Sequence, residues 1–503
     1  MGAARPASSP ASLPTSLPTS LPTSLPTSLP TSLPDARLLI AGRWLESERR
    51  QQALDKFRLT PCTTVHLPSR AQVAEAVAAA HAAYRASTLS PHERGAILER
   101  AATLLEQRSD DLVRALQLEV GFPASDGLGE LRRCITTFRL SAEEARNFRG
   151  EMVPIEGAPG QGGRLGFTLR VPLGVVCAIT PFNAPLNTVA HKVGPALAAG
   201  NAVVLKPSTH TPTAACIMVE ALLAAGLPPG LISVIHGGAE IAGWLLEEPL
   251  VRFYAFTGST EVGVSIQQRA GLRRTQMELG SIAFTLLADD ADLERALPKV
   301  VAAGYRKAGQ VCTSIQILLV QRGVLDVVTQ GLTRLVRALP YGDPLDAKTV
   351  VGPVISEGEA KRIERWIDEA IARGAERLAG GPRVGAVVPP TLLTRVDDSM
   401  ALGCQEVFGP VMSILPYDTL DEAIARVNAT PFGLATGLFT NRLADALRAA
   451  RELEVGGVHI NETSSSRVDV MPYGGSKQSG FGREGPHHAV REMSEERMIT
   501  WLA

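Results

Sequence analysis

Apolar residues from about residue 171 onward fall into short, nearly continuous runs, separated by segments in which apolar residues recur at helical spacing. The runs GVVCAIT, NAVVLKPS, LISVIHG and VRFYAFTGS have the length and composition of buried strands. The segments between them predict helices at Val189–Ala199 and Pro212–Ala225. Buried strands that alternate with helices indicate a parallel sheet covered on both faces, so we expect an α/β fold.

Two further regions extend this pattern. Upstream, ARLLIAGRWLES, from Ala36, alternates as a strand or hairpin does, and helices are expected at Ala74–Ala86 and Pro91–Gln107, the second capped by Ser90. After Ser281 a second series begins with FTLLADD, LERALPKVVAAGYRKAGQ and IQILLV. We interpret it as a second α/β unit, and a small-molecule cleft is expected where the two units meet.

Residues 12–34 repeat Ser-Leu-Pro-Thr almost without variation. Proline at this frequency blocks helix formation, and the segment is too polar to collapse into a core. We therefore predict that residues 1–35 form a disordered, partly polyproline-II tail. The alternative is a docking or targeting segment, which a single arginine and the lack of an amphipathic helix disfavour.

Composition narrows the class of protein. At 503 residues, 45% hydrophobic and 20% charged, the chain has the profile of a globular protein with more than one packed unit. Lys and Arg (50) nearly balance Asp and Glu (51), so no basic surface for nucleic acid is expected. No apolar run is long enough to span a membrane. The six cysteines stand singly, which favours a reducing, cytoplasmic location and neither a disulfide scaffold nor a metal site.

Four positions carry candidate chemistry. In FTGSTEVG, Gly258 and Ser259 follow a strand and open a helix, where backbone N–H groups can hold a pyrophosphate, although an ordinary turn explains the pattern equally well. Cys312 in KAGQVCTS has small neighbours and is either a nucleophile, its thiolate favoured near a helix N-terminus or backbone donors, or a structural cysteine. Glu278 in QMELGS is either a general base with a pKa raised by burial or a capping residue. Asn183 in ITPFNAP either donates to an oxyanion or occupies a proline turn.

Together these segments belong to a series of eight ordered motifs: ITPFNAPLN, GNAVVLKPS, FTGSTEVG, MELGS, GQVCTSIQ, QEVFGPV, GLATGLFT and PYGGSKQSGFGREG. On these motifs the chain, from Ala36 to its C-terminus, resembles the aldehyde dehydrogenase superfamily. The separation of 34 positions between Glu278 and Cys312 agrees with the register of that family. PFNAPLNTVAHKVGPALAAGN and RVDVMPYGG are similar to the lactaldehyde and semialdehyde dehydrogenase branch.

The resemblance implies a mechanism and a cofactor. Cys312 would attack the aldehyde to give a thiohemiacetal and then a thioester, Asn183 would stabilise the oxyanion, and Glu278 would activate the hydrolytic water. NAD or NADP would be the cofactor, and the substrate a small-molecule aldehyde. The residues implied in cofactor binding are Lys206 at an adenosine ribose hydroxyl, Gly258 and Ser259 at the pyrophosphate, Glu406 at the nicotinamide ribose with Phe408 beside it, and Thr180, Pro181, Phe182, Ser208, Thr209, Val262 and Leu279.

It also implies an organisation of the chain. A parallel-sheet cofactor domain would comprise 36–150 and 172–279, and an α/β catalytic domain would comprise 280–473. A small β flap at 151–171 and a C-terminal segment at 486–503 would join subunits into a homodimer or homotetramer.

Departures and alternatives remain. Thr209 stands where many NAD-preferring members carry an acidic residue, which leaves NADP open, and Ser281 replaces a glycine that most members have. A CoA-acylating relative generally lacks the motif glutamate, and a catalytically silent relative has no need of an intact Cys312 and Glu278. We also hypothesise that Arg467, just before the MPYGG turn, reaches the substrate entrance and pairs with an anionic group; a surface salt bridge is the alternative.

Overall fold

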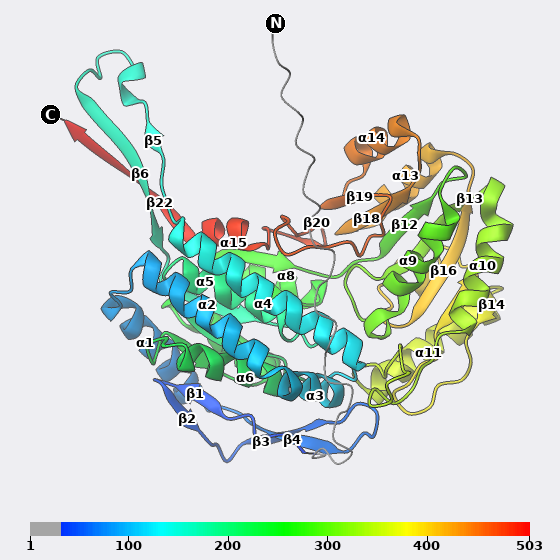
Figure 1. The fold of residues 1–503 in the computed structure, drawn as a ribbon, viewed down its shortest axis with the longest axis horizontal. Coiled ribbons are helices and arrows are strands. Elements are labelled where there is room, and N and C mark those ends of the chain that lie inside the picture. The colour runs from blue at the N-terminus through cyan, green and yellow to red at the C-terminus, as the bar shows by residue number, and fades with distance from the viewer. Residues whose placement is uncertain (1–31, 503) are drawn as a thin grey trace, which may run out of the picture.

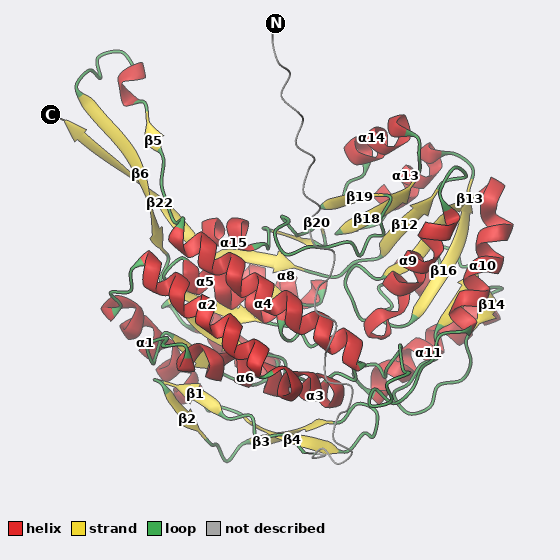
Figure 2. Cartoon of the chain, viewed as in Figure 1, coloured by secondary structure: helices red, strands yellow, loops and turns green. Residues whose placement is uncertain are grey.

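Two α/β domains and a projecting flap make up the structure, a computed structural model that describes residues 32–502 (Figures 1 and 2). The two domains lie side by side, with the chain crossing between them near the middle of the view in Figure 1. Each contains its own sheet and its own cluster of buried apolar residues. The predicted α/β class is therefore confirmed. Of the predicted tail at 1–35, residues 1–31 lie outside the described residues.

The first sheet has eight strands in the order β2-β1-β9-β8-β7-β10-β11-β21. Its five central strands, from β9 to β11, pair in parallel. Every residue of β7 and β8 is buried, as expected of strands covered by helices on both faces. The bounds are β1 (Leu38–Ile40), β2 (Arg43–Leu45), β7 (Val175–Ile179), β8 (Ala202–Lys206), β9 (Ile232–Val234), β10 (Val251–Thr257), β11 (Arg274–Glu278) and β21 (Gly480–Phe481).

Helices cover both faces of this sheet (Figure 2). The predicted helix at Pro91–Gln107 has these bounds and is closed by a capping box of Ser90 and Glu93. The preceding helix begins at Arg70, four positions before the expected start, because Ser69 forms a capping box of its own. The helices are α1 (Arg70–Ala86), α2 (Pro91–Gln107), α3 (Ser109–Glu119), α4 (Ala124–Arg146), α5 (Asn187–Ala198), α6 (Pro212–Ala224), α7 (Ala239–Glu247), α8 (Thr260–Ala270) and α15 (Pro486–Glu492), and a hairpin of β3 (Arg50–Leu54) and β4 (Pro61–His66) lies beside them.

The second sheet has seven strands in the order β14-β15-β16-β13-β12-β18-β19, all parallel to their neighbours except β14. After β19 the chain returns to the first sheet, where β21 pairs with β11. The strands are β12 (Ala283–Leu287), β13 (Ile315–Gln321), β14 (Glu376–Ala379), β15 (Thr391–Thr394), β16 (Val411–Tyr417), β18 (Ala435–Phe439) and β19 (Gly457–Ile460), with the short pair β17 (Phe432–Gly433) and β20 (Ser476–Lys477). The helices are α9 (Leu293–Tyr305), α10 (Leu325–Arg337), α11 (Glu357–Ala372), α12 (Ala401–Cys404), α13 (Leu420–Asn428) and α14 (Leu443–Glu452).

A three-stranded flap projects from the first domain (Figure 1). It is formed by β5 (Met152–Val153), β6 (Arg164–Pro172) and the C-terminal β22 (Ser494–Leu502), with β22 at one edge. The two segments predicted to join subunits thus meet in one sheet. Trp501 and Leu502 are 68% and 71% exposed at its tip, and an open edge with apolar side chains is a surface suited to pairing. The oligomer itself stays a prediction.

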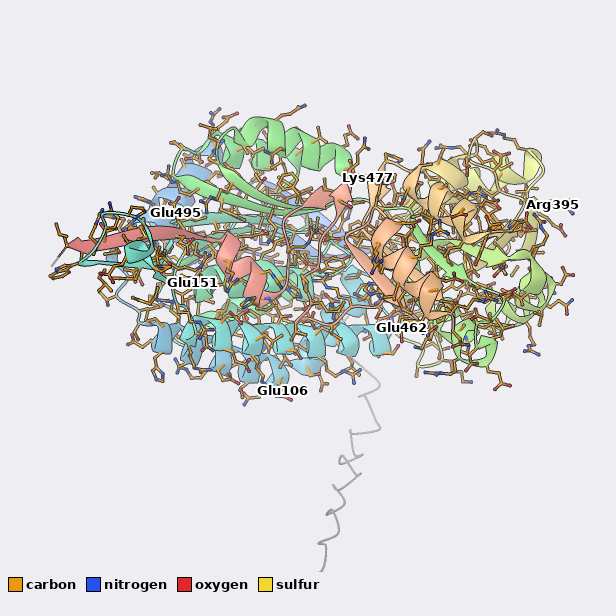
Figure 3. All side chains as sticks on the ribbon, turned by 90° about the horizontal axis from the view of Figure 1, so that it is seen from above. Glu106, Glu151, Arg395, Glu462, Lys477 and Glu495 are labelled. Atoms are coloured by element: carbon orange, nitrogen blue, oxygen red, sulfur yellow. The ribbon has the colours of Figure 1, made fainter. Side chains whose placement is uncertain are left out.

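Charged side chains cover the outside of both domains and the flap. Figure 3 shows Glu495 at the flap end of the molecule and Arg395 at the opposite end. Exposed pairs such as Arg274 with Glu495, 3.2 Å apart, contribute about 0–1 kcal/mol each, so the buried sheets dominate stability. Within residues 32–502, no helix has both the length and the apolar character needed to cross a membrane.

Candidate active site

A cavity of about 820 Å³ is lined by residues of both domains. Its volume is in the range of sites that enclose a small ligand. Thr180, Lys206, Gly258 and Glu278 lie at or directly after the carboxyl ends of β7, β8, β10 and β11, the edge at which open α/β sheets bind ligands. All the site residues proposed from the sequence line this cavity, namely Thr180, Pro181, Phe182, Asn183, Lys206, Ser208, Thr209, Gly258, Ser259, Val262, Glu278, Leu279, Cys312, Glu406 and Phe408.

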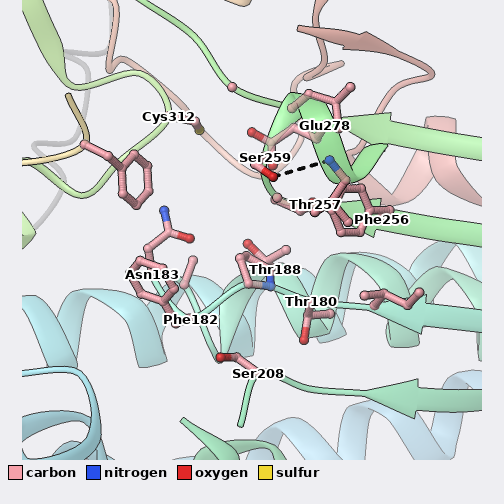
Figure 4. A pocket seen from close by; sticks show the side chains of 18 of the residues that line it. Thr180, Phe182, Asn183, Thr188, Ser208, Phe256, Thr257, Ser259, Glu278 and Cys312 are labelled. Atoms are coloured by element: carbon pink, nitrogen blue, oxygen red, sulfur yellow. Dashed lines mark hydrogen bonds between the residues drawn. The ribbon is translucent and has the colours of Figure 1, made fainter. Parts of the chain in front are cut away.

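The turn after β10 has the geometry expected of an anion-binding helix start. Ser259 is the N-cap of α8, and its hydroxyl accepts a hydrogen bond from the Val262 N–H at 3.4 Å, drawn as a dashed line in Figure 4. A side chain at Gly258 would place its Cβ 2.5 Å from the Phe256 ring, so any larger residue there would force the ring to move. The N-terminus of a helix attracts phosphate through its unpaired N–H groups and its dipole.

Two polar side chains of the first domain that line the cavity, Lys206 and Thr180, are suited to bind a ribose or an amide. The buried Lys206 Nζ donates to the Gly237 carbonyl at 2.6 Å, and burial lowers the pKa of Lys206 to about 8. The Thr180 hydroxyl is buried without a hydrogen-bond partner among residues 32–502. Because buried polar atoms are nearly always paired, this orphaned hydroxyl is consistent with a polar ligand in the cavity.

Glu406 and Phe408 reach the cavity from the second domain. The Glu406 carboxylate accepts a hydrogen bond from the Ser281 N–H at 3.0 Å, and burial raises the pKa of Glu406 to about 7. Phe408 has a φ of 47° and packs edge-on against Phe182, with ring centres 5.8 Å apart. Ser281, where the sequence departs from the common glycine, thus contributes its backbone to the position of Glu406.

The loop before Cys312 has an unusual backbone. Lys307, Ala308 and Gly309 have φ values of 53°, 53° and 69°, in the left-handed region that costs non-glycine residues about 1–2 kcal/mol each. Two residues of α4 hold the loop, since Asp126 accepts from the Lys307 N–H at 2.9 Å and Glu130 from Lys307 Nζ at 2.6 Å. The first domain therefore fixes a loop that belongs to the second.

Cys312 lies at the end of this loop, before β13, and not at a helix N-terminus. Its Sγ is 2.9 Å from the Tyr473 hydroxyl, which also donates to Glu278 Oε1 at 3.5 Å. Burial, and next the Glu278 carboxylate, raise the pKa of the Cys312 thiol, so the resting group is a thiol and not the favoured thiolate that the sequence suggested. Burial likewise raises the pKa of Glu278, in the direction expected of a general base.

Asn183 lies across the cavity from Glu278 in Figure 4, with its amide pointing toward Cys312. Its Nδ2 donates to the Gln310 carbonyl at 2.8 Å, which ties it to the loop that presents the thiol. The second hydrogen of this amide has no hydrogen-bond acceptor among residues 32–502 and is available to a ligand.

Four arginines line the cavity, and their partners differ; Arg362 pairs with Glu359 at 2.8 Å. Arg133 pairs with Asp469 at 2.8 Å, and Arg467 pairs with the buried Glu484 at 2.8 Å. Arg467 thus reaches the cavity as hypothesised, but the salt bridge it makes is buried and not on the surface. Arg306 donates to the Ser465 hydroxyl at 2.7 Å and forms no ion pair within the described chain. The sequence motifs did not point to Arg306 or Tyr473, although Arg306 lies six positions before Cys312 and Tyr473 lies within PYGG.

A thiol and a buried carboxylate lie together in a cavity at the ends of parallel strands, an arrangement that suits covalent chemistry beside a nucleotide. The model of the Aldehyde dehydrogenase family matches residues 44–499, so the chain belongs to that family. The 3-sulfolactaldehyde dehydrogenase of Priestia aryabhattai is 46% identical over 92% of this chain and 97% of its own length. The predicted resemblance to the lactaldehyde and semialdehyde branch is confirmed.

Two solved structures are similar along nearly the whole chain. Aldehyde dehydrogenase 21 from Physcomitrella patens, in complex with the reaction product succinate, has a TM-score of 0.91, 34% identity, and coverage of 93% of this chain and 98% of that one. The NADP-dependent glyceraldehyde-3-phosphate dehydrogenase from Bacillus halodurans C-125, complexed with NADP, has a TM-score of 0.91, 34% identity, and coverage of 93% and 100%. The protein is an oxidoreductase that acts on aldehydes with NAD or NADP.

Proposed function

We propose that the protein oxidises a small aldehyde that carries a second, negatively charged group to the corresponding carboxylic acid. The observation that carries this proposal is Arg306, a partly buried cation in the cavity without a carboxylate partner among residues 32–502. A charge removed from water without a partner is costly, so a substrate anion would stabilise the site. Sulfolactaldehyde, succinate and glyceraldehyde 3-phosphate, named for the three relatives, each carry such a group.

The anionic group would bind between Arg306 and Arg133, with the Ser465 hydroxyl as a further donor. Both guanidinium groups line the cavity, and Ser465 also lies 3.1 Å from the Thr313 hydroxyl, next to the thiol. Arginine suits sulfonate, carboxylate and phosphate because its planar donors contact two oxygens at once. Arg133 and Arg467 are both already paired, with Asp469 and Glu484 respectively, but the Arg133 side chain is 31% exposed and that of Arg467 only 14%, so Arg133 is the better placed to contact a second anion.

Cys312 would attack the aldehyde carbon to give a thiohemiacetal. The negative charge that develops on the aldehyde oxygen would be stabilised by the Asn183 amide and the Cys312 N–H. Loss of one such donor typically costs about 2.7–4 kcal/mol of barrier. When bound, the nicotinamide supplies the hydride acceptor.

Glu278 would then act as the general base on water to hydrolyse the thioester. Its carboxylate is buried, and burial and the neighbouring Glu484 raise its pKa toward the working pH, which favours proton transfer from water. Hydrolysis, rather than transfer to CoA, therefore follows from the presence of Glu278.

Residues of the first domain, together with Glu406 and Phe408 of the second, would bind the dinucleotide. Lys206 would bind an adenosine ribose hydroxyl, and Gly258 and Ser259 would bind the pyrophosphate at the start of α8. Glu406 would bind the nicotinamide ribose, with Phe408 beside it. The orphaned Thr180 hydroxyl and the absence of a carboxylate at Thr209 agree with NAD or NADP as the ligand.

The domain boundaries and the assembly belong to the same proposal. Residues 36–150 and 172–279 would form the cofactor domain and 280–473 the catalytic domain. The flap, with 151–171 and 486–503, would pair subunits into a homodimer or homotetramer, which light scattering of the purified protein would measure. A monomer under all conditions would contradict this assignment.

The proposal is tested by following nicotinamide reduction with 3-sulfolactaldehyde, succinic semialdehyde, glyceraldehyde 3-phosphate and neutral lactaldehyde, with NAD and NADP in turn. We expect the anionic aldehydes to have the higher kcat/KM, and Cys312→Ala to lose at least about 10⁴-fold, as removal of a nucleophile does. Turnover only with added CoA would contradict the hydrolytic role of Glu278. A higher kcat/KM for lactaldehyde would contradict the anion site, and no turnover with any aldehyde would leave a catalytically silent relative.

A further inference from the structure

The Tyr473 hydroxyl lies between the two reactive groups, 2.9 Å from Cys312 Sγ and 3.5 Å from Glu278 Oε1. Tyr473 is 8% exposed and lines the cavity, and a hydroxyl can accept one hydrogen bond while it donates another. We propose that Tyr473 relays the thiol proton of Cys312 to Glu278 and so generates the thiolate that attacks the aldehyde. This inference rests on the proposed function, in which Cys312 is the nucleophile.

The relay moves one proton at each end and leaves the tyrosine unchanged. The Cys312 S–H bond breaks as a new O–H bond forms on Tyr473, and the original tyrosine proton passes to Glu278 Oε1. The products are a thiolate, a neutral tyrosine and a protonated carboxyl group, so the negative charge moves from Glu278 to Cys312. Water that enters the cavity takes the proton from Glu278 before that residue serves as the base for hydrolysis. No oxidant or reductant is needed.

The site has a physical need for such a step. The thiol is held in its protonated form by burial, by the charge of the Glu278 carboxylate and by its own hydrogen bond to that carboxylate. Once the thiolate has formed, the Tyr473 hydroxyl can turn its hydrogen to the sulfur, and this hydrogen bond acts in the opposite direction and favours the thiolate. A thiol is a weak nucleophile, and its attack on an aldehyde therefore depends on a route by which the proton leaves.

Arg467 fixes the tyrosine ring and favours charge on its oxygen. The guanidinium carbon lies 3.7 Å from the centre of the Tyr473 ring, a cation–π contact. Arg467 is held by Glu484 Oε2 at 2.8 Å, and Lys192 Nζ holds the other oxygen of Glu484, Oε1, at 2.8 Å. The guanidinium is therefore positioned by two buried partners and stabilises any partial negative charge on the Tyr473 hydroxyl during transfer.

Two backbone hydrogen bonds connect Tyr473 directly to Glu484. The Tyr473 N–H donates to the Glu484 carbonyl at 3.1 Å, and the Glu484 N–H donates to the Tyr473 carbonyl at 2.7 Å. The ring, the arginine above it and the carboxylate behind the arginine are thus linked in one loop of contacts. Cys312, Glu278 and Arg467 are the titratable groups that face the hydroxyl, with Glu484 and Lys192 behind Arg467.

Tyr473→Phe removes the hydroxyl and keeps the ring under Arg467. The first readout is the pH dependence of Cys312 alkylation by iodoacetamide in the protein without cofactor. It is measured in a Cys404→Ser background, because Cys404 is exposed and the other four cysteines are buried. We expect the alkylation profile to move to higher pH and the rate at pH 7.5 to fall about tenfold. We expect kcat/KM to fall about 10²-fold, the lower range of general acid–base catalysis.

The matched control is Tyr254→Phe. Tyr254 is also buried, also lies under an arginine, with Arg273 5.0 Å from its ring centre, and donates to the Leu245 carbonyl, but it is not in the cavity lining. Loss of a hydroxyl there should leave the alkylation profile and kcat/KM unchanged. Melting temperatures of both variants show whether either has lost its fold.

A double-mutant cycle separates a relay from a simple hydrogen bond to sulfur. Glu278→Gln removes the proton acceptor, so in that background Tyr473→Phe should have little further effect on the alkylation rate if the two residues act in series. Additive effects, or an unchanged profile in Tyr473→Phe, would overturn the relay. Wild-type protein that oxidises no aldehyde would overturn the proposed function instead, because the alkylation profile is measured without substrate.

Discussion

The two halves of the cavity, the proposed cofactor half and the proposed catalytic half, are built by different physical means. In the cofactor half, the turn at Gly258 and Ser259 and the strand end at Ser208 and Thr209 present backbone and neutral groups. In the catalytic half, charged side chains pair with one another in the interior, as Lys192 and Arg467 do with Glu484 and as Arg133 does with Asp469, which also hydrogen-bonds to His191. The cofactor half depends on local chain geometry, whereas the catalytic half depends on contacts between residues far apart in the sequence.

This difference has consequences for both stability and activity. A neutral group at a cavity wall can be replaced with little loss of fold, whereas removal of one partner from a buried ion pair leaves the other charge uncompensated. The predictions below follow from this contrast and are ordered on one free-energy scale, on which about 1.4 kcal/mol corresponds to a factor of ten.

Glu484→Ala should have the largest effect. It leaves Lys192 and Arg467 without their shared carboxylate, and breaking a buried pair costs about 3–5 kcal/mol. Urea unfolding at neutral pH would measure the loss. The control is Ser208→Ala, which is expected to change the free energy of unfolding by about 0.5 kcal/mol or less. Equal losses in the two variants would remove the distinction between the halves.

Arg306→Met should lower kcat/KM for anionic aldehydes about 10²-fold, or about 2.7 kcal/mol, in the range for a desolvated charge contact. Methionine fills similar space but cannot pair with a sulfonate or carboxylate. Steady-state kinetics with 3-sulfolactaldehyde and with neutral lactaldehyde would separate the two contributions, because the neutral substrate should lose much less. Equal losses for both aldehydes would show that Arg306 positions the Cys312 loop and not the substrate.

The same contrast explains what the sequence could predict. The α/β class, the strands from β7 to β10 and the capped start of α2 follow from local patterns of apolar and capping residues. The candidate residues that line the cavity come from motifs in which a few neighbouring positions carry the geometry. For this reason, the motifs were sufficient to predict which residues line the cofactor half of the cavity.

The sequence predicted the catalytic half only in part, because its ion pairs join residues that are far apart in the sequence. Glu484 follows Lys192 by 292 positions, and Asp469 follows Arg133 by 336, so no local pattern relates them. The environment of Cys312 was also left open by its small neighbours, which allowed a favoured thiolate or a buried structural cysteine, and the folded site buries the thiol beside Glu278. Tyr473 reaches the thiol only through the return of the chain to the first sheet.

Glu406→Gln should change how stability depends on pH. Burial raises the pKa of Glu406 to about 7, so folding favours its protonated form. The penalty is absent below the unfolded-state pKa of about 4.3, grows as the pH rises to about 7, and is constant above that. A full shift from about 4.3 to about 7 corresponds to about 3.7 kcal/mol. Because the Glu406 side chain is only partly buried, we expect the variant to gain about 2 kcal/mol of this relative to wild type between pH 4.5 and pH 8, measured by denaturant unfolding without cofactor. A difference that does not vary with pH would contradict the shifted carboxyl.

Thr209→Glu should have the smallest effect, and only on the choice of cofactor. Thr209 lies beside Ser208 in the cofactor half, and a carboxylate there would repel the 2′-phosphate of NADP by about 1 kcal/mol or somewhat more at 4 Å in water. The ratio of kcat/KM for NADP to that for NAD is expected to fall about tenfold, as measured by nicotinamide reduction with one aldehyde. Thr209→Gln matches the size of the new side chain without its charge and should leave the ratio near that of wild type. If the glutamine variant lost NADP activity equally, steric exclusion would explain the change, and the cofactor half would discriminate by shape and not by charge.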